Sequence, residues 1–282
     1  MTRPRYAILA LAAWLVLPAT AAASTAGVSA DGELSVVGSP GEANRLTVTF
    51  IGSSPAGDAV FITDNGPGIQ AGANCFVSGS EVVCKGIENV SVSLGDRADG
   101  YADSGLDLPV TISGGDGDDR ITTRASARRA VQAGDGADVV RALGMSRRPA
   151  KLVGEDGNDH LEVIQGKGNL TGGSGNDELL GGKLKDNLTG GNGRDAIRGR
   201  GGADRLVGEG GIDLLVGGGG TDFFKSGAGS DQIRSRDGRA ETVDCTAGND
   251  QVRADRVDRL RPSCGPRQQP GGDGGPGGMA RR

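Results

Sequence analysis

The sequence predicts an all-β chain, a right-handed parallel β-roll (a β-solenoid) of glycine-rich nonapeptide repeats with a small N-terminal β cap. Between residues 172 and 234 nine residues repeat seven times without a gap, from GGSGNDELL to SGAGSDQIR. The sixth residue of every copy is aspartate and the eighth is apolar. Glycine makes up 53 of the 282 residues and aromatic residues only 3%, which argues against an ordinary globular core.

Each nonapeptide predicts a six-residue turn followed by a strand of three residues. Side chains on a strand alternate between its faces, so the eighth residue points into the core and the seventh and ninth point outward. Glycines allow the turn to adopt positive φ and bring its carbonyl groups towards a central ion. Two nonapeptides make one coil, which predicts that loops one coil apart stack at about 4.8 Å.

This stacking predicts two columns of carboxylates on opposite sides of the roll. Like charges about 4 to 5 Å apart repel by roughly 3 to 4 kcal/mol at an effective dielectric near 20, so cations are expected between successive loops. Backbone carbonyls and carboxylates form the hard oxygen cage that calcium prefers. The first column contains Asp177, Asp195, Asp213 and Asp231, and the second contains Asp186, Asp204 and Asp222.

The same motif recurs at wider spacing between residues 94 and 171. Full copies start at Gly114, Ala133 and Gly154, and a weaker copy starting at Leu94 places Asp99 in the aspartate column. Successive copies start 20, 19, 21 and 18 residues apart, which is close to one coil each. Only one side of the roll is therefore expected to keep ion-binding loops here. The whole roll is predicted to span residues 94–234.

Residues 1–23 resemble a secretory signal peptide. Two arginines precede an apolar run over residues 6–17, and three alanines precede Ser24, the predicted start of the mature chain. A membrane anchor is the alternative, although the run is short for the roughly 20 residues of a span. No further apolar run predicts a span in the mature chain. Secretion would place the chain where disulfides persist.

Residues 24–93 alternate as β-strands do and predict the capping module, with a separate ligand-binding domain as the rival interpretation. Four cysteines allow three connectivities, of which the most local pairs Cys75 with Cys84 and Cys245 with Cys264. Residues 235–264 are expected to form a C-terminal cap. The glycine- and proline-rich residues 265–282 are expected to be disordered.

The repeats resemble the haemolysin-type, or RTX, calcium-binding β-roll. The resemblance implies several bound Ca²⁺ ions held by aspartates together with carbonyls of their glycine turns. Asp186 is left out of this set, because Leu184 replaces the fourth glycine of its loop and the loop also contains two lysines, Lys183 and Lys185. The implied ligands are Asp119, Asp138, Asp159, Asp177, Asp195, Asp204, Asp213, Asp222 and Asp231.

Taken together, the sequence predicts a secreted, non-enzymatic calcium-binding protein that serves structure, surface attachment or binding of a cell-surface glycan or protein. An adhesin or ice-binding fragment is one alternative, and a polysaccharide-modifying solenoid enzyme is another. The only histidine, His160, is expected to be a solvated outward residue. A net charge of −5 disfavours nucleic acid as a partner.

Four apolar residues at outward positions suggest a docking patch within two adjacent coils. The alternative for this patch is that the C-terminal cap covers it, since scattered exposed apolar residues need no function. The four residues are Val207, Leu214, Val216 and Phe223.

Overall fold

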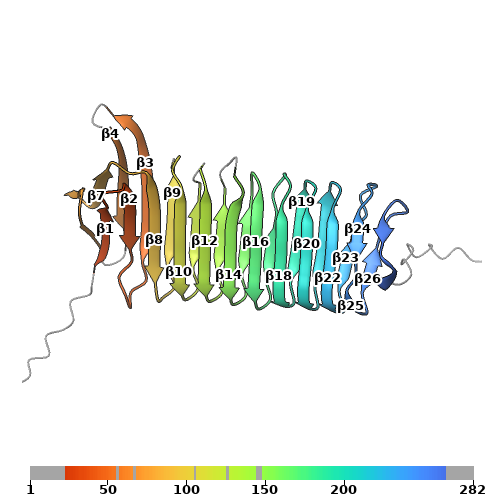
Figure 1. Cartoon of the computed structure of the whole chain (residues 1–282). Helices are drawn as coiled ribbons and strands as arrows, with labels where there is room; N and C mark the ends of the chain where they lie inside the picture. Colours follow the sequence, from red (N-terminus) through yellow and green to blue (C-terminus); the bar gives the residue numbers. More distant parts are fainter. Residues whose placement is uncertain are drawn as a thin grey trace, which may run out of the picture.

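The computed structural model describes residues 23–54, 57–65, 68–104, 106–124, 127–143 and 148–264. These residues form an all-β parallel solenoid of about nine turns with an antiparallel cap at its N-terminal end (Figure 1). The predicted all-β parallel solenoid with an N-terminal β cap is thereby confirmed. Almost all of the predicted signal peptide and the whole predicted disordered tail lie outside the described residues.

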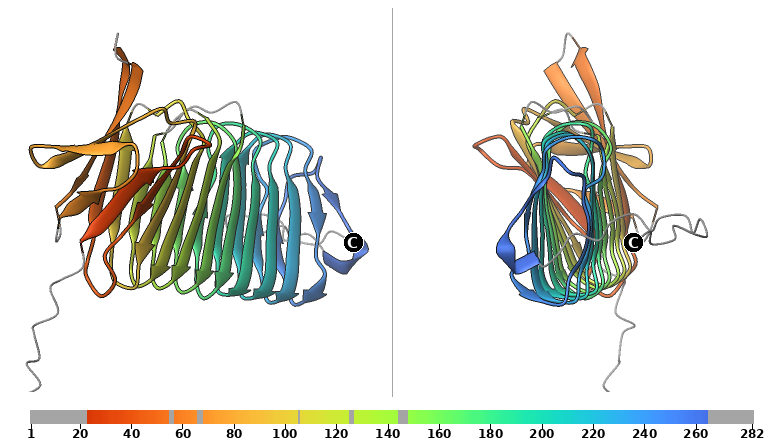
Figure 2. Two further views of the ribbon diagram at one scale, coloured as in Figure 1. Left: turned by 60° about the vertical axis from the view of Figure 1, so that its left-hand side comes forward. Right: turned by 90° about the vertical axis from the view of Figure 1, so that its right-hand side faces the viewer.

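Two sheets, here called sheet A and sheet B, form the walls of the roll, and a view along its axis shows them as a flattened loop (Figure 2). Among the described residues sheet A has 14 strands and sheet B has 13. Sheet A contains β1 (Ser24–Val28), β2 (Glu33–Val37), β5 (Ile69–Ala71), β8 (Asn89–Gly95), β10 (Val110–Asp116), β12 (Arg129–Asp135), β14 (Ala150–Asp156), β16 (Gly168–Ser174), β18 (Asn187–Gly193), β20 (Arg205–Gly211), β22 (Phe223–Gly229), β24 (Thr242–Asp244), β25 (Ala247–Gly248) and β27 (Arg259–Leu260). Sheet B contains β3 (Arg45–Ser54), β4 (Gly57–Asp64), β6 (Cys75–Ser78), β7 (Glu81–Lys85), β9 (Gly100–Ser104), β11 (Arg120–Thr123), β13 (Val139–Ala142), β15 (His160–Val163), β17 (Glu178–Leu180), β19 (Ala196–Gly201), β21 (Leu214–Gly219), β23 (Gln232–Arg234) and β26 (Gln251–Arg253).

The core is a double row of apolar side chains between the two sheets. Register pairs place each eighth residue of a repeat beside its equivalent in the next coil, for example Leu188 beside Leu206 in sheet A. All seven of these residues are fully buried, which agrees with the strand alternation expected from the repeat. They are Leu179, Leu188, Ile197, Leu206, Leu215, Phe224 and Ile233.

The strands are longer than the three residues that the repeat predicts. In sheet A, β18 covers seven residues and continues through the glycines that open its loop, where Gly191 pairs with Gly173 and with Glu209. Glycine lets neighbouring backbones stack closely enough for the turn itself to join the parallel ladder.

The N-terminal cap also supplies the first coil of the roll. Antiparallel pairs join β1 to β2, β3 to β4, and β7 to both β4 and β6. In addition, β2 pairs in parallel with β8, and β3 pairs in parallel with β9. The predicted disulfide between Cys75 and Cys84 is confirmed and joins β6 to β7.

Past residue 234 the coils continue rather than give way to a different structure. β24 and β25 extend sheet A, β26 extends sheet B, and β27 adds a final strand beside β24. The predicted disulfide between Cys245 and Cys264 is also confirmed, and it ties this last coil to a 3₁₀ turn, Pro262–Cys264.

The four residues of the suggested docking patch do not form one patch. Val207 and Phe223 lie on sheet A, and Leu214 and Val216 lie on sheet B. Successive nonapeptides alternate between the two walls, so these pairs face opposite directions. Val207 is 8% exposed, and the Phe223 ring is covered by the Arg205 guanidinium, 4.7 Å from its centroid.

Candidate calcium-binding columns

A continuous column of aspartates follows one edge of the roll, where each sheet A strand turns into sheet B. In each step the backbone N–H of one aspartate donates to Oδ1 of the aspartate in the next coil, over 2.7 to 3.0 Å. All but the last, Asp250, are at most 4% exposed. The column contains Asp99, Asp119, Asp138, Asp159, Asp177, Asp195, Asp213, Asp231 and Asp250.

The second carboxylate oxygen of nearly every member is buried without a donor. Oδ2 has no hydrogen-bond partner in eight of these nine aspartates, the exception being Asp250. Its surroundings are set by the first glycine of the loop. A β-carbon on Gly172 would collide with Oδ2 of Asp177 and lie 2.6 Å from the carbonyl oxygen of Gly190 in the next coil.

The same two kinds of oxygen meet at Gly154 and Gly190. Each loop therefore brings a carboxylate oxygen and a carbonyl oxygen from the next coil to one small space that only glycine leaves open. Both atoms are acceptors, so neither can satisfy the other. Buried acceptors without a donor cost about 1 to 3 kcal/mol each, more when they are charged.

The first coil has an asparagine at this position, and its side-chain N–H group donates a hydrogen bond to the equivalent carbonyl oxygen. Asn44 lies beside Asp99, and its backbone N–H donates to Oδ1 of Asp99 as a column member does. Its Nδ2 donates to the Leu94 carbonyl oxygen over 2.9 Å, and further to the carbonyls of Ser39 and Glu42. A β-carbon on Gly38 would meet Asn44 Nδ2 and that same Leu94 oxygen. An N–H thus occupies the place that Oδ2 occupies in later coils.

The opposite edge carries a shorter column that starts at Asp186. Asp186 and Asp204 donate their backbone N–H groups to Oδ1 of Asp204 and Asp222, each over 2.8 Å. Register places Glu241 beside Asp222 and Asp258 beside Glu241, so this column also extends into the last coils. Oδ2 of Asp204 is buried without a partner.

Asp186 differs from its neighbours because donors reach both of its oxygens. Gly168 donates to Oδ1, and Gly182 donates to Oδ2 over 2.7 Å. Leu184 does not adopt the positive φ that glycine shows at the fourth position of the neighbouring loops, such as Gly202 at 130°. The loop therefore folds differently and supplies a backbone N–H to its own aspartate.

Three charged residues hold the positive φ that the second loop position needs. Glu155, Arg200 and Glu209 have φ of 85°, 71° and 79°. Side chains are strained in this region, so the surrounding ladder imposes the turn even where glycine is missing. The substitutions at Arg200 and Glu209, which depart from the repeat, leave the loop conformation in place.

Burial raises the pKa of the column carboxyl groups. The pKa rises to about 7 for Asp119, Asp159, Asp204 and Asp213, because desolvation disfavours the charged form. Neighbouring column aspartates add to this, and the backbone N–H donors work against it. The columns therefore require either protons or cations near neutral pH.

Side chains alone do not form a metal cage anywhere in the described part of the chain. No group of three or more histidine, cysteine, aspartate or glutamate side chains there is arranged to hold a metal ion. Any cation in the columns would take most of its oxygens from the backbone. Carbonyl ligands of this kind suit calcium, which accepts six to eight oxygens in flexible geometry.

All nine sequence-predicted ligands lie in the two columns, seven in the first column and two, Asp204 and Asp222, in the second. Sequence reasoning missed Asp250, Glu241 and Asp258. A usable signal existed for Asp250, since Gly248, Asp250 and Val252 keep the spacing of the fourth, sixth and eighth repeat positions.

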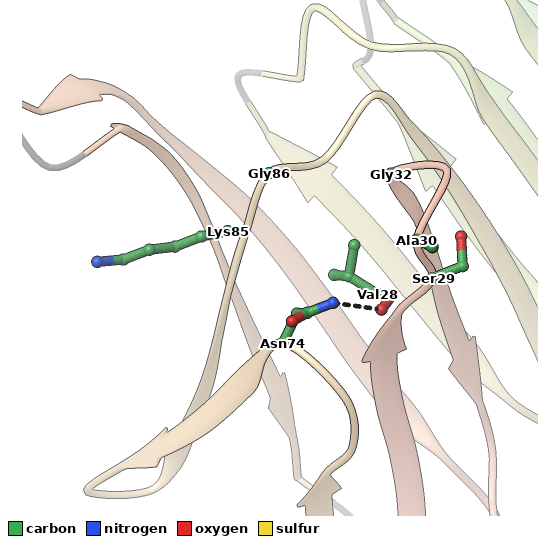
Figure 3. A pocket seen from close by; sticks show the side chains of 7 residues that line it. All are labelled: Val28, Ser29, Ala30, Gly32, Asn74, Lys85 and Gly86. Atoms are coloured by element: carbon green, nitrogen blue, oxygen red, sulfur yellow. Dashed lines mark hydrogen bonds between the residues drawn. The ribbon is translucent and has the colours of Figure 1, made fainter.

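Outside the columns the described residues include one histidine and a polar pocket in the N-terminal cap. His160 Nδ1 lies 2.9 Å from Oε2 of Glu178 on the outer face of sheet B. A polar pocket beside the cap is lined by seven residues, where Asn74 Nδ2 donates to the Val28 carbonyl and the Lys85 side chain points away (Figure 3). Within the described residues no helix is long and apolar enough to span a membrane.

A comparison with known protein families covers part of the two columns. The family model of the RTX calcium-binding nonapeptide repeat (4 copies) matches residues 110–126, 165–197, 181–215, 198–233 and 207–240. No curated protein and no solved structure gives a significant match. Repeats of this family are usually non-catalytic, and no catalytic family is identified. The chain carries RTX haemolysin-type calcium-binding nonapeptide repeats, and these repeats form its β-solenoid.

Proposed function

We propose that Ca²⁺ ions bind between successive loops of the two columns and that this binding drives folding of the roll. The observation that carries the proposal is the contrast between Asn44, whose Nδ2 donates to a loop carbonyl, and the aspartates, whose Oδ2 faces the equivalent carbonyl with no donor. A calcium ion supplies positive charge to both oxygens. The proposed ligands are Asp119, Asp138, Asp159, Asp177, Asp195, Asp204, Asp213, Asp222 and Asp231, with Asp99 extending the first column.

The protein residues contribute in two ways. Oδ1 of each aspartate accepts the N–H of the preceding aspartate and so fixes the orientation of the carboxylate, as between Asp195 and Asp213. The loop glycines keep the space beside Oδ2 open. Asp186 is not included, because Gly182 and Gly168 already supply donors to both of its oxygens.

We further propose that the protein is secreted and acts without catalysis, as a calcium-stabilised module for structure, surface attachment or partner binding. Proteins with such repeats are typically secreted, and the two disulfides agree with an oxidising compartment. Extracellular calcium modules bind in the range of about 10⁻⁴ to 10⁻³ M. Calcium would then keep the roll folded outside the cell, and a lack of calcium inside the cell would leave the roll unfolded before export.

A calcium titration followed by circular dichroism tests the coupling. Strand signal is expected to rise with calcium in the millimolar to submillimolar range and to stay low with magnesium, which demands a smaller octahedral site. Full strand signal in excess chelator would contradict coupled folding. Mass spectrometry of the native protein with and without chelator then counts the bound ions.

A further inference from the structure

The outer face of sheet B changes its charge pairing towards the C-terminal end. In the middle coils its arginines have glutamate partners: Arg198 contacts Glu178 over 2.7 Å and Arg200 contacts Glu162 over 2.8 Å. Arg141 likewise lies 3.5 Å from Glu162. Arg198 and Arg200 lean towards the N-terminal coils, and Arg141 leans towards the next coil, where Glu162 lies.

Further along the same face two arginines stand in register without such partners. Arg234 and Arg253 pair across β23 and β26 at the same outward position, so their side chains leave the sheet about 4.8 Å apart. Both are exposed, and neither has an ion pair with any residue that the structure describes. Like charges directly opposite each other destabilise a sheet.

A pocket lies between the paired and the unpaired arginines. Val216 stands in register between Arg198 and Arg234, and Gly218 stands beside Arg200. Because both residues are short, they leave a hollow between two rows of long side chains. The pocket is lined by Val216, Gly218, Arg234, Arg236 and Arg253.

We propose that this pocket binds a doubly charged tetrahedral oxyanion, a sulfate or phosphate group. Guanidinium groups present fixed forks of N–H donors that match such oxygens in pairs. Two charges on one group balance Arg234 and Arg253 together, which a single carboxylate would not. The floor of Val216 and Gly218 leaves room beside the anion for the sugar ring of a sulfate ester.

A competing explanation is that these arginines only protect the end of the sheet. β26 is the last strand of sheet B, and charged side chains on an edge strand discourage pairing with another chain. Edge protection needs charge but no defined anion site. The two explanations therefore differ in whether sulfate binds saturably and in whether the shape of the cation matters.

Calorimetric titration of sodium sulfate into the full, calcium-loaded chain tests the site, after circular dichroism has shown that each variant is folded. Wild-type protein is expected to bind one sulfate saturably and acetate at least about tenfold more weakly. Arg234→Gln/Arg253→Gln is expected to weaken sulfate binding at least about tenfold. Arg234→Lys/Arg253→Lys is expected to weaken it as well, although the charge is kept, because the forks are lost.

The matched control is Arg120→Gln/Arg141→Gln, which removes the same charge from adjacent coils of the same sheet, away from the pocket. It is expected to change sulfate affinity less than about twofold. A glucose sulfate ester run in parallel identifies the source: tighter binding than free sulfate indicates a sulfated sugar, and equal binding indicates the free ion. The proposal is overturned if wild-type protein shows no saturable sulfate binding, or if the control pair loses as much affinity as the pocket pair.

Discussion

The first coil and the later coils of the roll place different groups at one equivalent position. Asn44 in the first coil donates Nδ2 to the Leu94 carbonyl, and Asp177 in a later coil turns a bare oxygen towards the Gly190 carbonyl. The loop from Gly38 to Asn44 is one residue longer than the loop from Gly172 to Asp177, and the two side chains meet an equivalent carbonyl. At this position an N–H completes the first loop from protein atoms alone, whereas a carboxylate oxygen needs a proton or an external cation.

The edge that carries the second column shows another solution in its early coils. Register places Arg129, 1% exposed, at the inward position that Asp186 and the later column members occupy. Burial lowers the pKa of the Arg129 guanidinium, and the charge of Asp103, also 1% exposed, acts in the opposite direction. Here a protein cation stands inside the roll. The comparison teaches that every coil needs positive charge or a proton facing its buried oxygens, and that the source differs between regions.

Removing the buried charge of Arg129 should have the largest effect. Arg129→Ala takes away a buried cation whose charge acts on the buried Asp103, and removal of one of two interacting buried charges destabilises by about 3 to 5 kcal/mol. Chemical denaturation in saturating calcium measures this loss. The double variant Arg129→Leu/Asp103→Leu should be clearly more stable than Arg129→Ala. Equal stability would show that the charge balance between these two residues is unimportant.

Replacing Asn44 by the aspartate found in later coils should have the second-largest effect on stability. Asn44→Asp removes the donor to three carbonyls and adds a buried carboxylate, which should lower the free energy of unfolding at limiting calcium by about 3 kcal/mol. Saturating calcium should restore part of the loss, since the loop then resembles that of Asp177. Denaturation in limiting and in saturating calcium checks both statements, and a loss that saturating calcium does not reduce would count against equivalent loops.

Within the columns, the calcium midpoint of folding should respond unequally to neutralisation. Asp213→Asn removes one charge that stacked loops on both sides share, and we expect a midpoint about tenfold higher, because charge count tunes calcium affinity. Asp186→Asn should shift the midpoint less than about twofold, because backbone donors already satisfy Asp186. The two titrations run side by side, and equal shifts would refute shared sites.

A change of pH should have the smallest effect on stability, but it should act on several column aspartates at once. Burial raises the pKa of Asp119, Asp159, Asp204 and Asp213 to about 7, above the value near 3.9 of the unfolded chain. The protonated groups therefore stabilise the calcium-free fold fully below about pH 4, and this stability is lost as pH rises through 7. Circular dichroism of calcium-free protein should show more strand signal at pH 4.5 than at pH 7.5. With calcium the order should reverse, because protons compete for the same oxygens.

The sequence alone determined the parts of this protein that depend on local period. Regular spacing of Asp177, Asp195 and Asp213 predicted one column, and the apolar eighth residues predicted the core, because identical coils impose identical contacts on residues one period apart. The local cysteine pairs were also predictable. Each of these inferences needs only short-range spacing along the chain.

Only the tertiary structure decided which side chains share a position where the period fails. Asn44 lies 55 residues before Asp99, and Arg129 reaches the second column through turns of irregular length. Register there is fixed by hydrogen bonds between neighbouring strands. These hydrogen bonds keep the strands aligned although the turns between them differ in length, so a fixed spacing along the sequence does not predict which residues lie side by side. The same ladder keeps the coils stacked as far as Asp250 and Asp258, and it sets Arg234 beside Arg253.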